Sequence, residues 1–271
     1  MLFAQLSDTH IKAQRRLACR RVDSSTMLEA CIRTLNRLKP APDLVVITGD
    51  LTEFGAAEEY AALRDILAAL KAPLLVVPGN HDEREAMRAA FADAAYLPAT
   101  GFLHFVIDEY PLRLIGLDTL QPNQAGGRLC SVRLAWLEKT LARRAEAPTV
   151  IAMHHPPFNC GIEHMDKIAL ADSFAFADII SRHPQIELVL CGHLHRTVRA
   201  SVGGLPVLAC PSPAHQVELD LNHGAPSLFR MEPPGFMLHR WHDGTLVSHL
   251  AVIGDFAGPF PFFDDHGSLI D

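Results

Sequence analysis

Hydrophobic residues form short continuous runs along the first two thirds of the chain, and amphipathic stretches separate these runs. The runs are rich in β-branched residues, which is typical of buried strands. Five of them are Leu2–Leu6, Leu44–Thr48, Leu74–Val77, Val150–Met153 and Leu188–Leu190. Strands that alternate with helices predict an α/β fold.

Four amphipathic stretches carry apolar residues at helical spacing between or beside these runs. Ser24-Ser25 is predicted to cap the first helix, which Pro40-Ala41-Pro42 would end. The other three stretches are Ala56 to Lys71, the segment after Ser131 that carries Leu134, Leu137 and Leu141, and about Ser173 to Arg182. We assign their apolar faces to core packing and give them no chemistry.

The rest of the chain divides by composition. Phe102–Ile107 and Leu112–Leu117 are predicted to be antiparallel strands, and Phe236–Trp241 and Thr245–Val252 a closing pair. We therefore expect a catalytic core at 1–211, an irregular cap or oligomer contact at 212–235, closing strands at 236–255 and an aromatic tail at 256–271. The tail contains Pro259-Phe260-Pro261-Phe262-Phe263 and is expected to dock on another surface, because disordered segments are rarely this aromatic.

Composition narrows the possible partners. The 271 residues carry a net charge of -7 and 49% are hydrophobic, with no long cluster of Lys and Arg. This balance argues against a long nucleic-acid polymer as partner. We find no secretory signal and no apolar run long enough to cross a bilayer, so we expect a cytoplasmic protein with no membrane partner. Six scattered cysteines without Cys-x-x-Cys spacing disfavour a zinc ribbon.

Five polar motifs follow or end the five apolar runs. They are Asp8-Thr9-His10, Gly49-Asp50, Gly79-Asn80-His81-Asp82, His154-His155-Pro156 and Gly192-His193-Leu194-His195. Residues two apart at a strand end point to the same side, so Asp8 and His10 could converge on one ion. A carboxylate such as Asp50 could bridge two cations with its two oxygens.

Single motifs have simpler explanations. Gly49-Asp50 could be a turn with a helix cap, and Gly79-Asn80 could be a turn alone. The paired histidines after apolar strands are harder to explain structurally, because buried imidazoles need ligation or hydrogen bonds. Asn80 offers a neutral carbonyl ligand, and the adjacent His81 could face a substrate as proton donor. Together the motifs predict a two-metal hydrolase site.

The ordered set closely resembles the calcineurin-like metallophosphoesterase superfamily. Outside the five motifs, the segments that resemble its bacterial branch of glycerophosphodiesterases and class III cyclic-nucleotide phosphodiesterases are Ala4–His10, Glu58-Glu59-Tyr60, Met153–Pro157, Met165-Asp166, Pro213–Val217 and Ala257-Gly258-Pro259. The resemblance implies a four-layer α/β/β/α sandwich with a small C-terminal cap or oligomerisation segment.

The resemblance also implies a ligand set. One metal would be bound by Asp8, His10, Asp50 and His195, and the other by Asp50, Asn80, His154 and His193, so that Asp50 bridges them. His154 is preferred to His155 because the superfamily ligand precedes x-Pro. The O and N ligands suit two ions of Fe, Mn, Zn or Co.

The implied activity is hydrolysis of small phosphodiesters by in-line attack of a hydroxide held between the metals. Two divalent ions, Asp8, Asp50 and the hydroxide sum to about +1, which matches a monoanionic diester better than a dianionic monoester. His81 would stabilise charge or protonate the leaving alkoxide, unless it only orients Asn80. His215 would reach the substrate. A broad phosphomonoesterase and a non-catalytic scaffold are the alternatives, and a homo-oligomer is expected.

Overall fold

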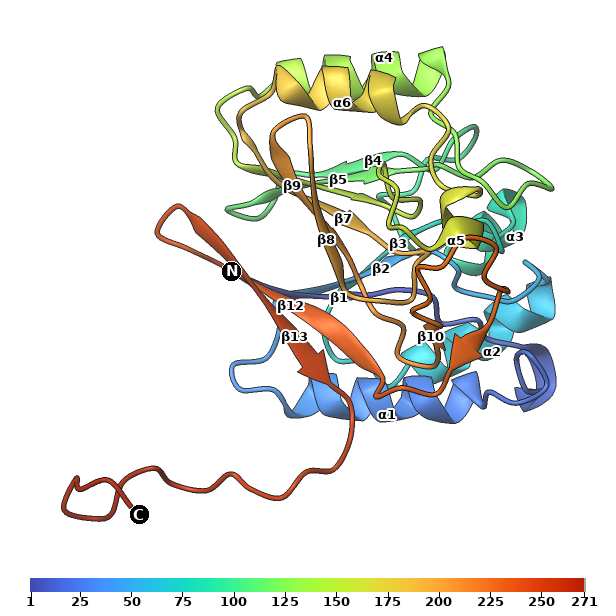
Figure 1. Cartoon of the computed structure of the whole chain (residues 1–271). Coiled ribbons are helices and arrows are strands. Elements are labelled where there is room, and N and C mark those ends of the chain that lie inside the picture. Colours follow the sequence, from blue (N-terminus) through green and yellow to red (C-terminus); the bar gives the residue numbers. More distant parts are fainter. Residues whose placement is uncertain (271) are drawn as a thin grey trace.

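The computed structural model of the chain describes residues 1–270 and contains two sheets packed face to face, with helices on both outer faces (Figure 1). The first sheet has five strands in the order β13-β12-β1-β2-β3. Its strands are β1 (Leu2–Leu6), β2 (Leu44–Thr48), β3 (Leu74–Val77), β12 (Gly235–His242) and β13 (Thr245–Val252). Strands β1, β2 and β3 are parallel, and β12 and β13 continue the sheet antiparallel.

The second sheet has six strands in the order β4-β5-β6-β7-β9-β8. Its strands are β4 (Phe105–Ile107), β5 (Arg113–Leu117), β6 (Thr149–Met153), β7 (Ile186–Cys191), β8 (Val198–Val202) and β9 (Leu205–Ala209). Strands β5, β6, β7 and β9 are parallel, while β4 and β8 are antiparallel edge strands. A separate ladder of two residues each joins β10 (Gln216–Val217) to β11 (Phe229–Arg230).

Three hydrophobic clusters hold the four layers together. Phe3, Val46, Val150 and Leu190 belong to the cluster between the two sheets. The other two clusters join each sheet to its own helices. The helices on the first sheet are α1 (Ser24–Arg37), α2 (Ala57–Leu67) and α3 (Arg84–Ala90), those on the second are α4 (Ser131–Ala142) and α6 (Ser173–Ser181), and the short elements are η1 (Ala13–Arg15) and α5 (Glu163–Asp166). The predicted α/β/β/α sandwich is therefore confirmed.

Most predicted elements form close to their predicted bounds, with specific differences. Asp23, rather than Ser24-Ser25, caps α1, and its side chain accepts from the backbone N–H of Thr26. Strand β4 begins at Phe105 and not at Phe102. The helix predicted for Ala56 to Lys71 ends at Leu67. Helix α3 and the β8–β9 hairpin were not predicted. Helix α3 is short, whereas the strict alternation of apolar and polar residues in β8 (VRASV) is a strand signal.

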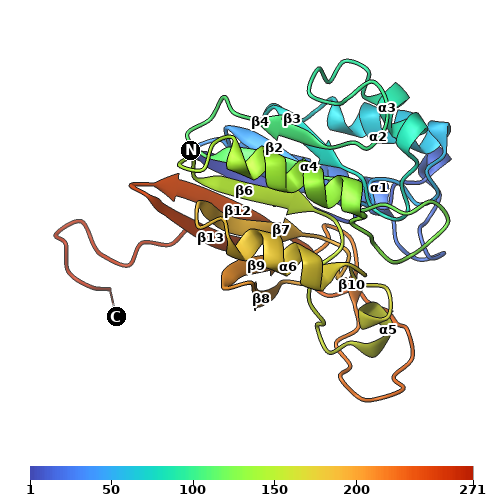
Figure 2. The ribbon, with the colours of Figure 1, turned by 90° about the horizontal axis from the view of Figure 1, so that it is seen from above.

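The aromatic tail runs away from the two sheets in both views (Figure 2). Phe260 and Phe262 are 74% and 79% exposed, and Phe256 and Phe263 are also exposed. The expected docking of this tail therefore does not occur on the body of its own chain over the residues described. The proposed division into core, cap, closing strands and tail stays a prediction.

Candidate metal centre

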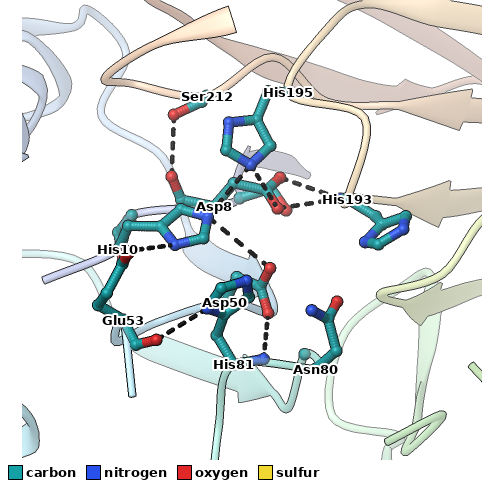
Figure 3. A network of polar contacts seen from close by, with 12 residues as sticks. Asp8, His10, Asp50, Glu53, Asn80, His81, His193, His195 and Ser212 are labelled. Carbon is teal, nitrogen blue, oxygen red and sulfur yellow. Dashed lines mark hydrogen bonds and ion pairs between the residues drawn. The ribbon is translucent and has the colours of Figure 1, made fainter. Parts of the chain in front are cut away.

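The carboxyl ends of the parallel strands bring the five predicted motifs together at one edge of the sandwich. Asp8 follows β1, Asp50 follows β2, and Asn80 follows β3 in the first sheet. His154 follows β6 and His193 follows β7 in the second sheet. The backbone N–H of His193 donates to the Asp8 carboxylate at 3.0 Å, so the two sheets meet at this edge (Figure 3).

The backbone of this edge is unusual. Non-glycine residues rarely adopt positive φ, and each such residue costs about 1–3 kcal/mol unless the fold enforces it. Five of the predicted ligands have positive φ: Asp8 (58°), His10 (44°), Asp50 (49°), His193 (70°) and His195 (50°). Concentration of strained backbone in these loops is typical of a functional site.

Two glycines permit the close approach of the loops. A Cβ on Gly79 would lie 2.2 Å from Oδ1 of Asp50, and a Cβ on Gly192 would lie 1.9 Å from Oγ of Ser7 and 3.1 Å from Oδ2 of Asp8. No side chain fits at these separations. The glycines in the Gly79–Asp82 and Gly192–His195 motifs are therefore required by the space around the two aspartates.

Hydrogen bonds fix the tautomers of His10 and His195. Nδ1 of His10 donates to Oε2 of Glu53 at 3.1 Å, and Nδ1 of His195 donates to the backbone oxygen of His215 at 3.0 Å. When both rings are neutral, each presents a lone pair at Nε2, and the two Nε2 atoms face each other at 3.1 Å. Nε2 of His195 is also 3.5 Å from Oδ1 of Asp8. Burial opposes protonation of His10, but the hydrogen bond to Glu53 and the negative Asp50 raise its pKa, so this group of acceptors favours an added proton or a bound cation.

A second set of acceptors surrounds His154. Its Nδ1 donates to the backbone oxygen of Thr48 at 2.8 Å, so its Nε2 is directed toward Oδ1 of Asn80 at 3.0 Å and Oδ2 of Asp50 at 3.3 Å. Nδ1 of His193 lies 3.3 Å from the same Nε2. The donor chemistry at both sets, carboxylate, amide oxygen and imidazole, fits divalent metal ions.

Asp50 lies between the two sets. Its Oδ2 is 3.7 Å from Nε2 of His10 on one side and 3.3 Å from Nε2 of His154 on the other, while its Oδ1 accepts from the backbone N–H of His81 at 2.9 Å. Burial opposes ionisation of Asp50, but the nearby His154 and His81 hold the pKa of its carboxyl well below the usual range. An ionised carboxylate in this position can contact both sets.

Other ionisable groups show that the site favours an added positive charge. Burial raises the pKa of Asp8 to about 6. Burial opposes protonation of His154, but the negative Asp50 outweighs it and raises the pKa of His154 to about 9. In the metal-free protein a proton therefore occupies the acceptor set around His154, in the place where a metal ion would lie.

His155 differs from its neighbour His154. Its Nε2 donates to the backbone oxygen of Ala125 at 3.1 Å, and its Nδ1 accepts from Oγ1 of Thr119 at 2.8 Å. Burial lowers the pKa of His155 to about 3. The Nδ1 lone pair of His155 is already occupied by the Thr119 hydroxyl, whereas Nε2 of His154 faces acceptor atoms, which supports the choice of His154 over His155 as ligand.

The two predicted substrate-facing histidines also lie beside the acceptor sets. Nδ1 of His81 donates to the backbone oxygen of Glu53 at 2.8 Å, which leaves its Nε2 for another partner. The ring of His215 lies 4.6 Å from the ring of His195, and burial lowers the pKa of His215 to about 2. His81 and His215 line one cavity of about 350 Å³ together with His10, Asp50, Asn80, His193 and His195.

Three supporting residues were missed in the sequence. Glu53 holds His10 through its carboxylate and His81 through its backbone. Oγ of Ser212 donates to the backbone oxygen of Asp8 at 2.8 Å. Asp82 accepts from the backbone N–H groups of Leu51 and Gly79, at 3.2 and 2.8 Å, and so ties two motif loops together. Only Asp82 carried a signal, as the last residue of its motif.

A two-sheet sandwich with acceptor clusters at the strand ends defines a class of metal-binding phosphoesterases, and comparison with known proteins agrees. A model of the family described as calcineurin-like phosphoesterase matches residues 1–197. The chain belongs to this family. The predicted family and enzyme class, a phosphoric ester hydrolase, are thereby confirmed.

Two relatives that match nearly the whole chain are named as phosphodiesterases, and a solved structure shares the fold. The chain is 40% identical over 273 residues, covering all of both chains, to a probable glycerophosphodiester phosphodiesterase GpdQ from Arcobacter nitrofigilis. It is 30% identical over 256 residues, covering 94% of this chain and 91% of the relative, to the 3′,5′-cyclic adenosine monophosphate phosphodiesterase CpdA of Pseudomonas aeruginosa. A dimetal phosphatase from Danio rerio has the same fold, with a TM-score of 0.69 at 14% identity over 93% of this chain and 98% of that one. No helix among residues 1–270 is long and apolar enough to span a membrane.

Proposed function

We propose that this protein is a binuclear-metal-dependent phosphodiesterase of small phosphodiesters, either 3′,5′-cyclic nucleotides, glycerophosphodiesters or both. The observation that carries the proposal is the convergence of carboxylate, amide and imidazole ligand atoms on both sides of Asp50. Relatives named as glycerophosphodiester and cyclic AMP phosphodiesterases support the substrate class. The charge of about +1, expected for two divalent ions with two aspartates and one hydroxide, favours a monoanionic diester over a dianionic monoester.

We assign the first ion to Asp8, His10, Asp50 and His195 and the second to Asp50, Asn80, His154 and His193. Ligand atoms of Asp8, His10 and His195 lie within 4.8 Å of one another, which supports the first set. For the second set, Asp50 and His154 form such a group with Asp8, and His154 and His193 form another with His155. When bound, the ions would supply Lewis-acid activation of the phosphoryl group and of the attacking water. Fe, Mn, Zn and Co all suit the ligands.

The protein's own residues complete the reaction. Hydrolysis adds water to phosphorus, breaks one ester P–O bond and requires a proton on the departing alkoxide. Because Nδ1 of His81 donates to the Glu53 carbonyl, Nε2 is the atom that faces another partner; with both nitrogens protonated, Nε2–H would deliver that proton or stabilise the developing charge and leave the ring neutral. His215, at the far side of His195, would contact the substrate's organic part.

Self-association is part of the proposal. Strand β13 is an edge strand whose Val247 and Leu250 are 44% and 52% exposed, and the tail adds exposed phenylalanines. Exposed apolar edges of this kind commonly pair with another chain. We therefore expect a homo-oligomer. The cytoplasmic location stays a prediction.

The first test compares wild type with Asp50→Ala. Metal content by elemental analysis is paired with Mn(II)-supplemented hydrolysis of bis(p-nitrophenyl) phosphate, p-nitrophenyl phosphate and 3′,5′-cAMP. We expect close to two metals and diester cleavage in wild type, and loss of both in the variant. Circular dichroism of the variant checks that its fold is retained.

Two outcomes would contradict the proposal. A strong preference for p-nitrophenyl phosphate would make the protein a phosphomonoesterase. A wild type that stays metal-free and inactive under every supplement would leave only a scaffold role on the same fold. Turnover of 3′,5′-cAMP decides whether cyclic nucleotides are substrates.

A further inference from the structure

The cavity beside the candidate metal centre has a polar wall and a mainly apolar wall. One wall consists of the predicted ligands together with Glu53 and His81. The second wall is mainly apolar and comes from two segments distant in sequence. Its residues are His164, Met165 and Ile168 from the α5 region and Val217, Ser227, Leu228 and Phe229 from the β10–β11 segment.

The two segments of this wall are joined to each other and to the metal centre. Oε2 of Glu163 in α5 accepts from the backbone N–H of Gly224 at 2.6 Å and lies 3.0 Å from Nδ1 of His223. The ring of Phe229 lies 5.2 Å from the ring of His215, which in turn lies beside His195. Both overall views place α5 next to the segment that carries β10 (Figures 1 and 2). The apolar wall is therefore a continuous, tethered surface.

The cavity lining contains carboxylates but no Lys or Arg, and all of its residues belong to the described part of the chain. Glu53 adds a carboxylate beyond the predicted ligands. Four basic residues of the surrounding segments each contact another side chain of the protein. Lys167 pairs with Glu163 at 2.7 Å, Arg84 with Asp118 at 2.6 Å and Arg196 with Glu232 at 2.9 Å. Lys12 lies over the ring of Phe54, 4.8 Å from its centroid.

We propose that this mainly apolar wall, whose described residues include no Lys or Arg, is a specificity site for the second ester group of the diester, and that it selects alcohols that are neutral or cationic over alcohols that bear another anionic group. The inference rests on the proposed phosphodiesterase function and narrows its substrate class. Two bound metal ions would balance the one phosphodiester charge, whereas a second anion would face Glu53 and apolar side chains. Of the wall residues named above, only His164 and Ser227 could donate to it, and none is a Lys or Arg that would act as counter-ion. An unpaired charge removed from water is costly.

The test uses three p-nitrophenyl phosphodiesters that share the leaving group and differ in the second ester: ethyl, choline and 2-carboxyethyl. Assays with Mn(II) at pH 8 keep unperturbed imidazoles neutral. We expect kcat/KM for the ethyl and choline esters to exceed that for the carboxyethyl ester at least tenfold. Equal rates on all three, or a preference for the carboxyethyl ester, would overturn the inference while leaving the phosphodiesterase in place. No turnover of any ester would contradict the proposed function itself.

A matched pair of variants tests the wall directly. Leu228 lines the cavity and is 55% exposed, whereas Leu219 is 56% exposed in the same segment and does not line it. Leu228→Lys is expected to reduce the preference against the carboxyethyl ester about tenfold, because it supplies the missing cation. Leu219→Lys adds the same net charge and is expected to leave the preference unchanged. An equal change in both variants would mean that long-range charge, and not the wall, sets the preference.

Discussion

Two buried polar clusters lie at the carboxyl ends of neighbouring strands, and they are built on opposite principles. In the candidate metal centre, Nε2 of His10 and Nε2 of His195 face each other at 3.1 Å beside the carboxylates of Asp50 and Asp8. In the other cluster, the buried carboxylate of Asp118, which follows β5, meets donors on every side. Arg84 contacts both of its oxygens at 2.6 and 2.8 Å, and the backbone N–H groups of Leu103 and Leu120 each donate at 3.0 Å.

The contrast separates a structural cluster from a binding cluster. A buried charge that its own chain satisfies stabilises the fold and has no capacity left for a ligand. A buried group of acceptors with too few protein donors costs free energy until a proton or a metal ion binds among them, and this is typical of a binding site. Hydrogen-bond balance, more than residue type, therefore distinguishes Asp118 from Asp50.

The largest expected effect separates His154 from His155. His154→Gln removes a proposed ligand whose other nitrogen donates to Thr48. We therefore expect loss of metal from one site and a fall in diesterase kcat/KM of about a thousandfold, since metal activation is worth several kcal/mol. His155→Gln is the matched control and is expected to keep both metals. Elemental analysis and kinetics of the two variants check this. Metal loss in His155→Gln with retention in His154→Gln would reverse the assignment.

The second prediction concerns Asp118. Asp118→Asn leaves Arg84 without its charged partner in a buried cluster, and breaking such a pair typically costs about 3–5 kcal/mol. We expect a loss of that size in urea unfolding, with the metal content of the folded protein unchanged. Asp93→Asn, at an exposed pair with Arg64, is the control and is expected to cost less than about 1 kcal/mol. Loss of metal without loss of stability in Asp118→Asn would place Asp118 in the metal centre.

The sequence indicated the residues of the candidate metal centre but not those of the Asp118 cluster, and the reason is physical. Residues such as His193 and His195 stand at fixed spacing after apolar strands, because a ligand pair must share one side of a strand end. Asp118 depends on Arg84, 34 residues away, and no local pattern records that pairing. Alternating strands and helices predicted an α/β fold, but only the family resemblance predicted the four layers. The packing of one sheet on another depends on contacts between residues far apart in the sequence. The cavity wall formed by α5 and β11 could not be predicted from the sequence, because it also depends on contacts between distant segments.

The third prediction is a pH dependence of metal binding. The pKa of His154 is raised to about 9, so at pH 7 the metal-free ring is protonated and an incoming ion must displace that proton. Affinity is therefore expected to rise with pH, about tenfold per unit between pH 6 and 8 for one displaced proton, and to level off near the pKa. Competition for Zn(II) against a chromophoric chelator at several pH values measures this. An affinity that does not change over this range would mean that His154 is neutral before the ion binds.

The smallest expected effect concerns the aromatic tail, which contrasts with both clusters because its residues are exposed. Phe260 and Phe262 are exposed to solvent, so deletion of residues 256–271 removes no core packing. The free energy of unfolding of dilute protein should therefore change by no more than about 0.5 kcal/mol. Deletion from Thr245 onward is the control, because β13 pairs with β12 from Gly235 to His242 and its loss exposes that strand. If the tail deletion instead lowers stability only at high protein concentration, the tail packs on a second copy. A loss above 1 kcal/mol at every concentration would show that the tail packs on its own chain.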